Sequence, residues 1–136
     1  MGIKQKSLSV QTHDRVETQD ITAEVTRFLR ESGFSEGMVF VYCPHATAAI
    51  FLNEDEPRLQ RDVLNFVKRL VPSSESYEHN AIDDNAAAHL AAILVGNCVA
   101  IPVAAGRLGT GTWQQVLLLE LDGPRRRTVN LVGLGQ

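Results

Sequence analysis

The sequence has few cysteines, few aromatic residues and no excess of positive charge. Of its 136 residues two are cysteine and 6% are aromatic, and 13 Lys and Arg stand against 16 Asp and Glu. Two cysteines exclude a disulfide scaffold and a four-cysteine zinc site. Because Cys43 and Cys98 both lie in apolar runs, we expect buried free thiols in a reducing compartment. The lack of basic charge and of stacking rings argues against nucleic acid as a partner.

The sequence also lacks the pattern of a signal peptide and that of a membrane span. The first twenty residues carry charges throughout and contain no apolar run. Residues 85–106 contain no Asp, Glu, Lys or Arg and approach the length of a span. Gly96-Asn97 and Pro102 interrupt them, which favours a helix, a turn and a strand instead. We therefore expect a cytoplasmic protein with no membrane partner.

What is present is a mixture of short strands and amphipathic helices. Hydrophobic periodicity predicts helices at 22–32, 57–71 and 84–95, and strands at 3–12, 15–18, 37–42, 48–52, 98–103, 113–121 and 126–132. Residues 73–83 are expected to form a polar loop, and Asp122-Gly123-Pro124 is typical of a tight turn that closes a C-terminal hairpin. Since strict strand–helix–strand alternation is missing, the order predicts an α+β fold with mixed or antiparallel sheets, as one domain spanning 1–136.

Four histidines are the first candidates for chemistry. His13 is typical of an exposed turn, whereas His45, His79 and His89 are predicted near loop ends or the start of a helix. Imidazole is a common ligand of transition metals, and three such ligands with one open position make a catalytic zinc site. Their spacing matches no compact metal motif, and a histidine in an alanine-rich helix is also typical of a packed core. The residues alone leave a metal site and structural histidines both open.

Three further segments contain candidate polar residues. Glu54 belongs either to the acidic first turn of the helix at 57–71 or to a site in which it orients a histidine or acts as acid or base. The glycine-rich residues 106–114 match neither a P-loop nor a dinucleotide-binding fingerprint, and indicate a bulged strand, a turn or a backbone approach to phosphate. Residues 125–127, three consecutive arginines, are either solvated or grip a phosphate.

Several of these pieces occur in an order that resembles the YjbQ family, whose members are often labelled secondary thiamine-phosphate synthases. The matching motifs extend over about residues 20–130 and include Pro44-His45-Ala46-Thr47, Asn53-Glu54, Tyr77-Glu78-His79, His89-Leu90, Gly111-Thr112-Trp113-Gln114 and Asp122-Gly123-Pro124-Arg125. The resemblance implies sheets packed as a sandwich with about three helices outside, a homotrimer, and a pocket that holds three histidines, often with a bound metal. Ala46 departs from the family pattern, which has Thr there, so a hydroxyl is missing beside His45.

The resemblance also implies a reaction, in which a pyrimidine diphosphate is joined to a thiazole phosphate with release of pyrophosphate. We expect catalytic residues at His45, Glu54 and Asn85, and substrate contacts at Thr47, Asn53, Gly111, Trp113 and Arg125. The expected metal ligands are His45, His79 and His89, and the metal is zinc or another transition metal, or Mg²⁺ if the synthase reaction holds. Arg107, Arg125 or Arg127 would then bind the phosphates.

Two other functions stay open from the sequence. Three histidines also suit a metal-dependent hydrolase of a small phosphorylated or carbonyl substrate. The third function is that of a non-catalytic trimeric binding or scaffold protein, in which the histidines only satisfy buried polar neighbours.

Overall fold

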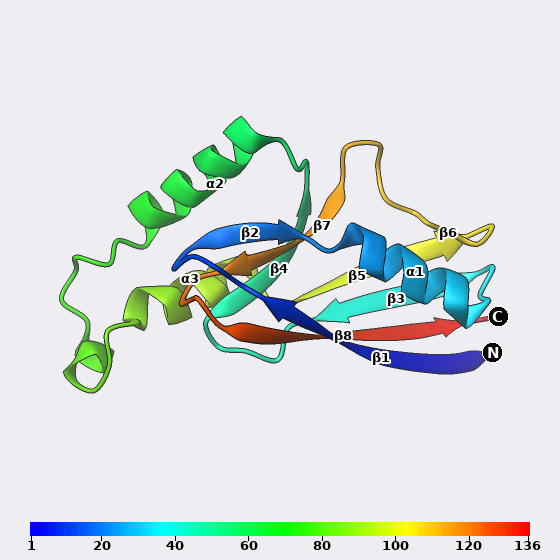
Figure 1. The fold of residues 1–136 in the computed structure, drawn as a ribbon, viewed down its shortest axis with the longest axis horizontal. Coiled ribbons are helices and arrows are strands. Elements are labelled where there is room, and N and C mark those ends of the chain that lie inside the picture. Colours follow the sequence, from blue (N-terminus) through cyan, green and yellow to red (C-terminus); the bar gives the residue numbers. More distant parts are fainter.

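The computed structural model describes residues 1–136 as two β-sheets covered by helices (Figure 1). The strands are β1 (Gly2–Gln11), β2 (Glu17–Asp20), β3 (Gly37–Tyr42), β4 (Ala48–Asn53), β5 (Cys98–Ala104), β6 (Arg107–Leu108), β7 (Gln115–Glu120) and β8 (Arg126–Gly135). The helices are α1 (Thr22–Ser32), α2 (Pro57–Leu70), α3 (Ala86–Val95) and the short 3-10 helix η1 (Glu78–Ala81). The α+β class and the three predicted helices are confirmed.

Every strand pairing in the two sheets is antiparallel. The larger sheet has the strand order β1-β8-β3-β5-β6, and the smaller sheet has the order β2-β7-β4. In the smaller sheet Ala48 lies opposite Glu120 and Asn53 lies opposite Gln115. The first residue of β4 therefore lies beside the last residue of β7, and this register decides which candidate residues meet.

The central strand β7 is buried on both faces, which explains its unbroken apolar sequence. Val116 and Leu118 belong to the larger apolar cluster, which fills the space between the sheets and beneath α1. Leu119 and Leu121 belong to a second cluster with residues of α2 and α3. Since successive side chains of a strand point to opposite faces, Glu120 follows Leu118 into the space between the sheets. A charged group in that position requires a partner.

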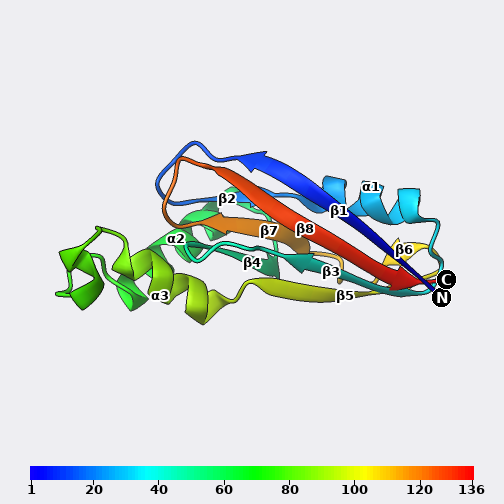
Figure 2. The same cartoon turned by 90° about the horizontal axis from the view of Figure 1, so that it is seen from below.

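The helices lie at opposite ends of the molecule, and their ends are fixed by different local contacts. Helix α1 packs Val25, Phe28 and Leu29 on the larger cluster and ends at Gly33, which has φ of 75°. Helix α2 begins after Glu56, whose Oε2 accepts a hydrogen bond from the backbone N–H of Leu59. Figure 2 shows α2, η1 and α3 gathered at one end, with both termini at the other. None of the helices is both long and apolar enough to cross a membrane.

The predicted C-terminal hairpin is wrong, because β7 and β8 belong to different sheets. The connection between them is bonded to other loops rather than closed on itself. The N–H of Leu121 donates to Thr47 O, that of Gly123 donates to Arg15 O, and that of Arg125 donates to Thr12 Oγ1. The chain therefore crosses from one sheet to the other at this point.

Two smaller expectations also need correction. Strand β7 begins at Gln115, so Trp113 lies in the preceding loop and is 71% exposed rather than being the first residue of an apolar strand. Cys43 is buried as expected, whereas Cys98 is exposed at the start of β5. An apolar sequence around a cysteine does not decide which face of its strand the thiol occupies.

Candidate functional site

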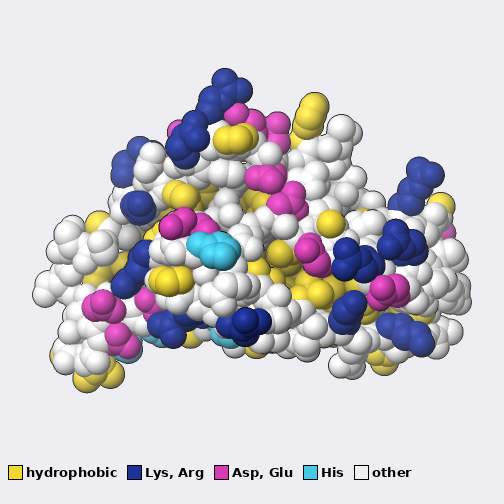
Figure 3. Space-filling view, viewed as in Figure 1, with side chains coloured by type: hydrophobic (Ala, Val, Ile, Leu, Met, Phe, Trp, Pro, Cys, Tyr) yellow, Lys and Arg dark blue, Asp and Glu magenta, His cyan; other side chains and the backbone are white.

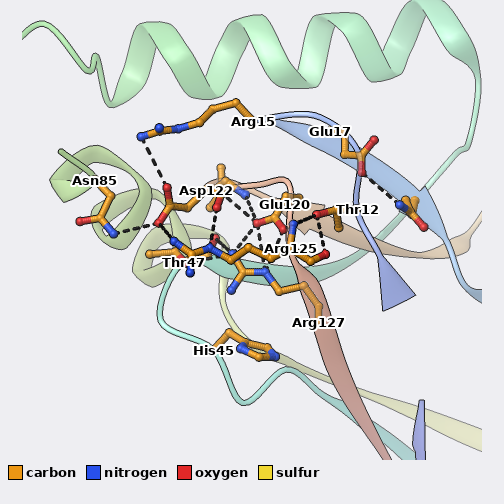
Figure 4. Close-up of polar contacts among 12 residues, drawn as sticks. Thr12, Arg15, Glu17, His45, Thr47, Asn85, Glu120, Asp122, Arg125 and Arg127 are labelled. Carbon is orange, nitrogen blue, oxygen red and sulfur yellow. Dashed lines mark hydrogen bonds and ion pairs between the residues drawn. The ribbon is translucent and has the colours of Figure 1, made fainter. Parts of the chain in front are cut away.

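A network of buried polar side chains lies at the end of β7 where β4 begins (Figure 4). Glu120 is 0% exposed and Arg127 of β8 is 3% exposed. The guanidinium donates to Glu120 through Nε, 2.9 Å from Oε1, and also through Nη2, while the Thr12 hydroxyl donates to Oε1 at 2.7 Å. Burial alone would raise the pKa of Glu120, but the hydrogen bonds from Arg127 and Thr12 outweigh it and hold that pKa below its usual range.

Arg127 also fixes the loop that carries His45. Its Nη2 donates to the carbonyl oxygen of Thr47 at 3.0 Å and to the Thr47 hydroxyl at 2.9 Å. Arg127 is buried and already paired with Glu120, so its guanidinium serves the fold in this structure, and its expected contact with a substrate phosphate stays a prediction. The Thr47 hydroxyl, expected to contact substrate, is occupied by the same guanidinium.

The imidazole of His45 is a hydrogen-bond acceptor for the protein backbone. Its Nε2 accepts a hydrogen bond from the backbone N–H of Thr128 at 2.9 Å. The neutral ring therefore carries its proton on Nδ1. Burial lowers the pKa of His45, and the positive charge of Arg127 lowers it further. Neither ring nitrogen of His45 offers a free lone pair in this arrangement.

A second carboxylate, Asp122, lies two residues beyond Glu120 and is 6% exposed. Its Oδ2 accepts from Asn85 Nδ2 at 2.8 Å and from Arg125 Nη2 at 2.9 Å, and its Oδ1 lies 3.5 Å from Arg15 Nη2. Two guanidinium groups and one amide thus compensate the buried charge (Figure 4). Arg125 therefore holds Asp122 and is only partly available as the expected substrate contact.

The turn after Asp122 requires glycine. A Cβ on Gly123 would lie 2.3 Å from the backbone oxygen of Asp14 and 2.8 Å from Cγ of Glu120. Any side chain at this position would push apart the loops that bring the two buried carboxylates together.

Asn85 connects this network to a pair of histidines. Its Oδ1 lies 3.1 Å from Nε2 of His79 in η1. The rings of His79 and His89 meet edge to face, with 4.8 Å between their centroids and an interplanar angle of 81°. The two histidines line a cavity of about 220 Å³ together with Glu78 and Leu90. This pair is the part of the predicted histidine site that one chain brings together.

A larger cavity of about 560 Å³ is also bounded by Asn85. Its apolar lining residues come from the second core cluster and its surroundings, and they include Val16, Val67, Val71, Ala88, Ala91 and Leu121. Its polar lining includes the cations Arg15 and Lys68, the acidic residues Asp14 and Asp84, and Ser73. On the face in Figure 3, acidic and basic side chains are interspersed, with apolar side chains visible between them. The cavity therefore suits a molecule with an apolar part and a charged part.

Four predicted site residues lie away from the histidines. Asn53 is the last residue of β4 and Glu54 follows it. Because Asn53 is paired with Gln115, the first residue of β7, the loop residues Gly111 and Trp113 precede β7 at that same end. The five residue steps along β4 separate its two ends by about 17 Å at about 3.3 Å per residue. Within the chain no three or more His, Cys, Asp or Glu side chains are grouped so as to hold a metal ion. The three-histidine centre stays a prediction.

Sequence reasoning missed the residues that organise this end of the molecule. Glu120, Asp122, Thr12 and Arg15 were not among the predicted site residues, although they form most of the buried polar contacts. One signal was available, because Glu120 ends a run of apolar residues in a strand with two buried faces. Such a charge predicts a buried cation nearby.

Comparison with known proteins identifies the family. Residues 6–136 match the family described as UPF0047 protein YjbQ-like. A UPF0047 protein of Archaeoglobus fulgidus is 48% identical over 90% of this chain and 94% of its own length. The chain therefore belongs to the YjbQ (UPF0047) family.

Solved structures agree with this assignment. A hypothetical protein of Aeropyrum pernix has a TM-score of 0.96 at 44% identity and covers 98% of this chain and 99% of its own. A YbjQ-like protein of unknown function from Sulfolobus solfataricus has a TM-score of 0.98 at 40% identity, covering 99% of both chains. The fold is thus shared across most of each chain.

Proposed function

We propose that this protein is a small metal-dependent enzyme of the thiamine-phosphate synthase type. In this proposal His79 and His89 bind a divalent transition metal, and the cavity of about 560 Å³ binds a phosphorylated substrate. The observation that carries the proposal is the position of Asn85, which lines that cavity and contacts His79, one ring of the imidazole pair, through its side-chain amide. A ligand in the cavity would therefore lie one side chain away from the histidines.

The donor set at the imidazole pair fits a transition metal. The two rings are adjacent, and they line one cavity together. Imidazole nitrogens favour zinc and related ions over Mg²⁺, which prefers oxygen ligands. A bound ion would supply positive charge to stabilise a leaving phosphate group. His45 is the third ligand of the proposal, and it must first release the N–H of Thr128.

We place the complete site between chains of a homotrimer. The predicted residues lie at two ends of β4 and β7, so one chain cannot bring them together. Several large apolar side chains on the helices are more than 40% exposed, namely Phe66, Leu70, Leu90, Ile93 and Leu94. Contact between copies would bury them and would add a neighbour's residues to the site. Sedimentation equilibrium should give three times the chain mass, and Leu94→Glu should lower it. A parent that sediments as a single chain would contradict the trimer.

The cations of the larger cavity suit a phosphorylated substrate. Lys68 takes part in none of the ion pairs of the structure, and Arg15 pairs with Asp84 and Asp122 only at 3.5 Å. In the proposed reaction the thiazole nitrogen attacks the methylene carbon of the pyrimidine diphosphate and forms a C–N bond. The C–O bond breaks, and pyrophosphate leaves with its electron pair. Lys68 and Arg15 would hold the phosphate charge while the apolar residues exclude water.

The test compares two neighbouring cations of α2. Lys68 lines the cavity, whereas Arg69 does not. Coupling of the two substrates should be assayed by chromatography of the product with Zn²⁺, Mn²⁺ or Mg²⁺ supplied. We expect Lys68→Gln to raise KM for the phosphorylated substrates about tenfold, the value of about 1.4 kcal/mol for one phosphate contact, and Arg69→Gln to leave it unchanged. Absence of coupling in the parent with every metal would refute the synthase reaction.

A metal-dependent hydrolase is the second candidate, and the imidazole donors favour it. Zinc enzymes that hydrolyse esters and amides use nitrogen-rich ligand sets of this kind. The same assay separates the two, since hydrolysis would release phosphate or pyrophosphate without forming the coupled product. Saturable substrate binding with neither product would instead indicate a binding protein.

A further inference from the structure

A directed chain of hydrogen bonds runs from Asp122 through Asn85 to His79. We infer that Asp122 is a positioning residue that acts through the Asn85 amide. It holds His79 with the proton on Nε2, and so leaves the Nδ1 lone pair as the atom that binds a ligand. The assignment of the proton rests on the contacts alone, whereas the role of Nδ1 in metal binding rests on the proposed function.

The first step is the orientation of the Asn85 amide. The Asp122 carboxylate lies against the guanidinium groups of Arg125 and Arg15, and a carboxylate can only accept hydrogen bonds. The amide group that faces Asp122 must therefore be the NH₂ of Asn85, which donates to Oδ2 at 2.8 Å. The carbonyl oxygen of the amide then faces the other way, towards His79.

The second step is the proton on the imidazole. An amide oxygen can only accept, so the Nε2 atom that lies 3.1 Å from Asn85 Oδ1 must carry a hydrogen. A neutral imidazole has one N–H, and Nδ1 of His79 therefore keeps its lone pair. Such an outer partner fixes the ring that binds a metal and increases its basicity.

The third step is the rigidity of the chain of contacts. Asp122 and Asn85 are 6% and 7% exposed, whereas His79 lies at the surface. Asp122 is held at both oxygens, by Arg15 on Oδ1 and by Arg125 on Oδ2. Rotation of the Asn85 amide would place its oxygen against the Asp122 carboxylate and its NH₂ against the His79 ring. The buried Asp122 and Asn85 therefore determine which nitrogen of the exposed His79 carries the proton.

The decisive measurement is the protonation pattern of His79 in the metal-free protein. Long-range ¹H–¹⁵N correlation spectra of ¹⁵N-histidine protein at neutral pH distinguish the two ring nitrogens, and loss of signals in His79→Gln assigns them. We expect a protonated Nε2 and an unprotonated Nδ1. A protonated Nδ1 in the neutral ring of the parent would overturn the inference. This measurement on the parent requires no substitution of Asp122 or Asn85.

A matched pair of variants tests whether Asp122 is the cause. Asp122→Asn keeps the shape but can donate as well as accept, so the Asn85 amide can turn and His79 should no longer show a single pattern. Asp84→Asn is the control, because Asp84 also pairs with Arg15 at 3.5 Å but its side chain makes no hydrogen bond with Asn85, whose amide donates to Asp122. An Asp122→Asn spectrum identical to that of the parent would reject the positioning role.

Zinc binding separates this inference from the proposed function. Titration with Zn²⁺ alone should show an affinity 10- to 100-fold lower in Asp122→Asn than in the parent, the range typical for loss of an outer partner, and unchanged in Asp84→Asn. If the expected proton pattern holds and the parent binds no Zn²⁺, the positioning role stands and the metal proposal fails. Equal zinc affinity in the parent and Asp122→Asn would overturn the role of Asp122 in ligand binding.

Discussion

His45 and His79 lie at the same end of the fold and use their rings in opposite ways. His45 accepts the N–H of Thr128 at Nε2, so its lone pair serves the backbone. His79 faces an acceptor at Nε2, so its lone pair at Nδ1 is free. In this structure the ring of His45 serves the backbone whereas that of His79 keeps a free lone pair, although the sequence presents both as loop residues before a strand or helix.

The two histidines are served by different carboxylates. Glu120, fully buried and paired with Arg127, holds the loop that carries His45 through the contacts of Arg127 with Thr47. Asp122 is paired with half-exposed arginines and orients Asn85. Glu120 is the last residue of β7 and points between the sheets, whereas Asp122 lies beyond the strand in the connection to β8 and contacts Asn85, which precedes α3.

The largest effect should come from breaking the buried pair. Arg127→Met leaves the Glu120 charge without its partner, and we expect a loss of about 3–5 kcal/mol in the free energy of unfolding. Arg126→Met is the matched control, since Arg126 is exposed and donates only to Ser9, and it should change stability by less than about 0.5 kcal/mol. Urea denaturation at neutral pH measures both. Equal losses would show that Glu120 does not depend on Arg127.

A smaller effect should separate the two histidines. His45→Ala leaves the N–H of Thr128 unsatisfied, and we expect it to cost about 1–3 kcal/mol. His79→Ala opens Asn85 to water at an exposed position and should cost less than about 0.5 kcal/mol. The same denaturation experiment ranks them. A larger cost for His79 would reverse the division of roles drawn above.

Much of the fold was predictable because hydrophobic periodicity decides where a segment buries its side chains. The helices at 22–32 and 57–71 match α1 and α2 nearly to the residue, since each has an apolar stripe and a defined start and stop. The hairpin expected at 122–124 failed because a turn motif does not say whether the strands it joins stay in one sheet.

The site was harder to predict because its contacts come from distant parts of the chain. Thr12 meets Glu120 over 108 residues, and Thr47 meets Arg127 over 80. The resemblance to known proteins named His79, His89 and Asn85, which the fold does bring together. It could not distinguish these from Asn53 and Trp113, because a motif gives the order of residues along the chain and not the end of the strand at which each lies.

The smallest effect is a pH dependence specific to His45. Because burial and Arg127 lower its pKa in the folded state, the unfolded chain binds the proton more readily, and stability falls as pH decreases below about 6.5. Protonation also removes the lone pair that accepts the N–H of Thr128. The lowered pKa of Glu120 acts in a separate window, since its contribution is present above about pH 4.3 and is lost only as pH falls through its folded value.

The difference in unfolding free energy between the parent and His45→Ala should therefore shrink from pH 7.5 to pH 5. Urea denaturation at several pH values measures it, with both proteins in the same buffer series. Glu120 cancels in this difference because both proteins retain it. If this difference in unfolding free energy stayed constant from pH 7.5 to pH 5, the stability contributed by His45 would not depend on its protonation state. The hydrogen bond from the N–H of Thr128 would then not be the source of that stability.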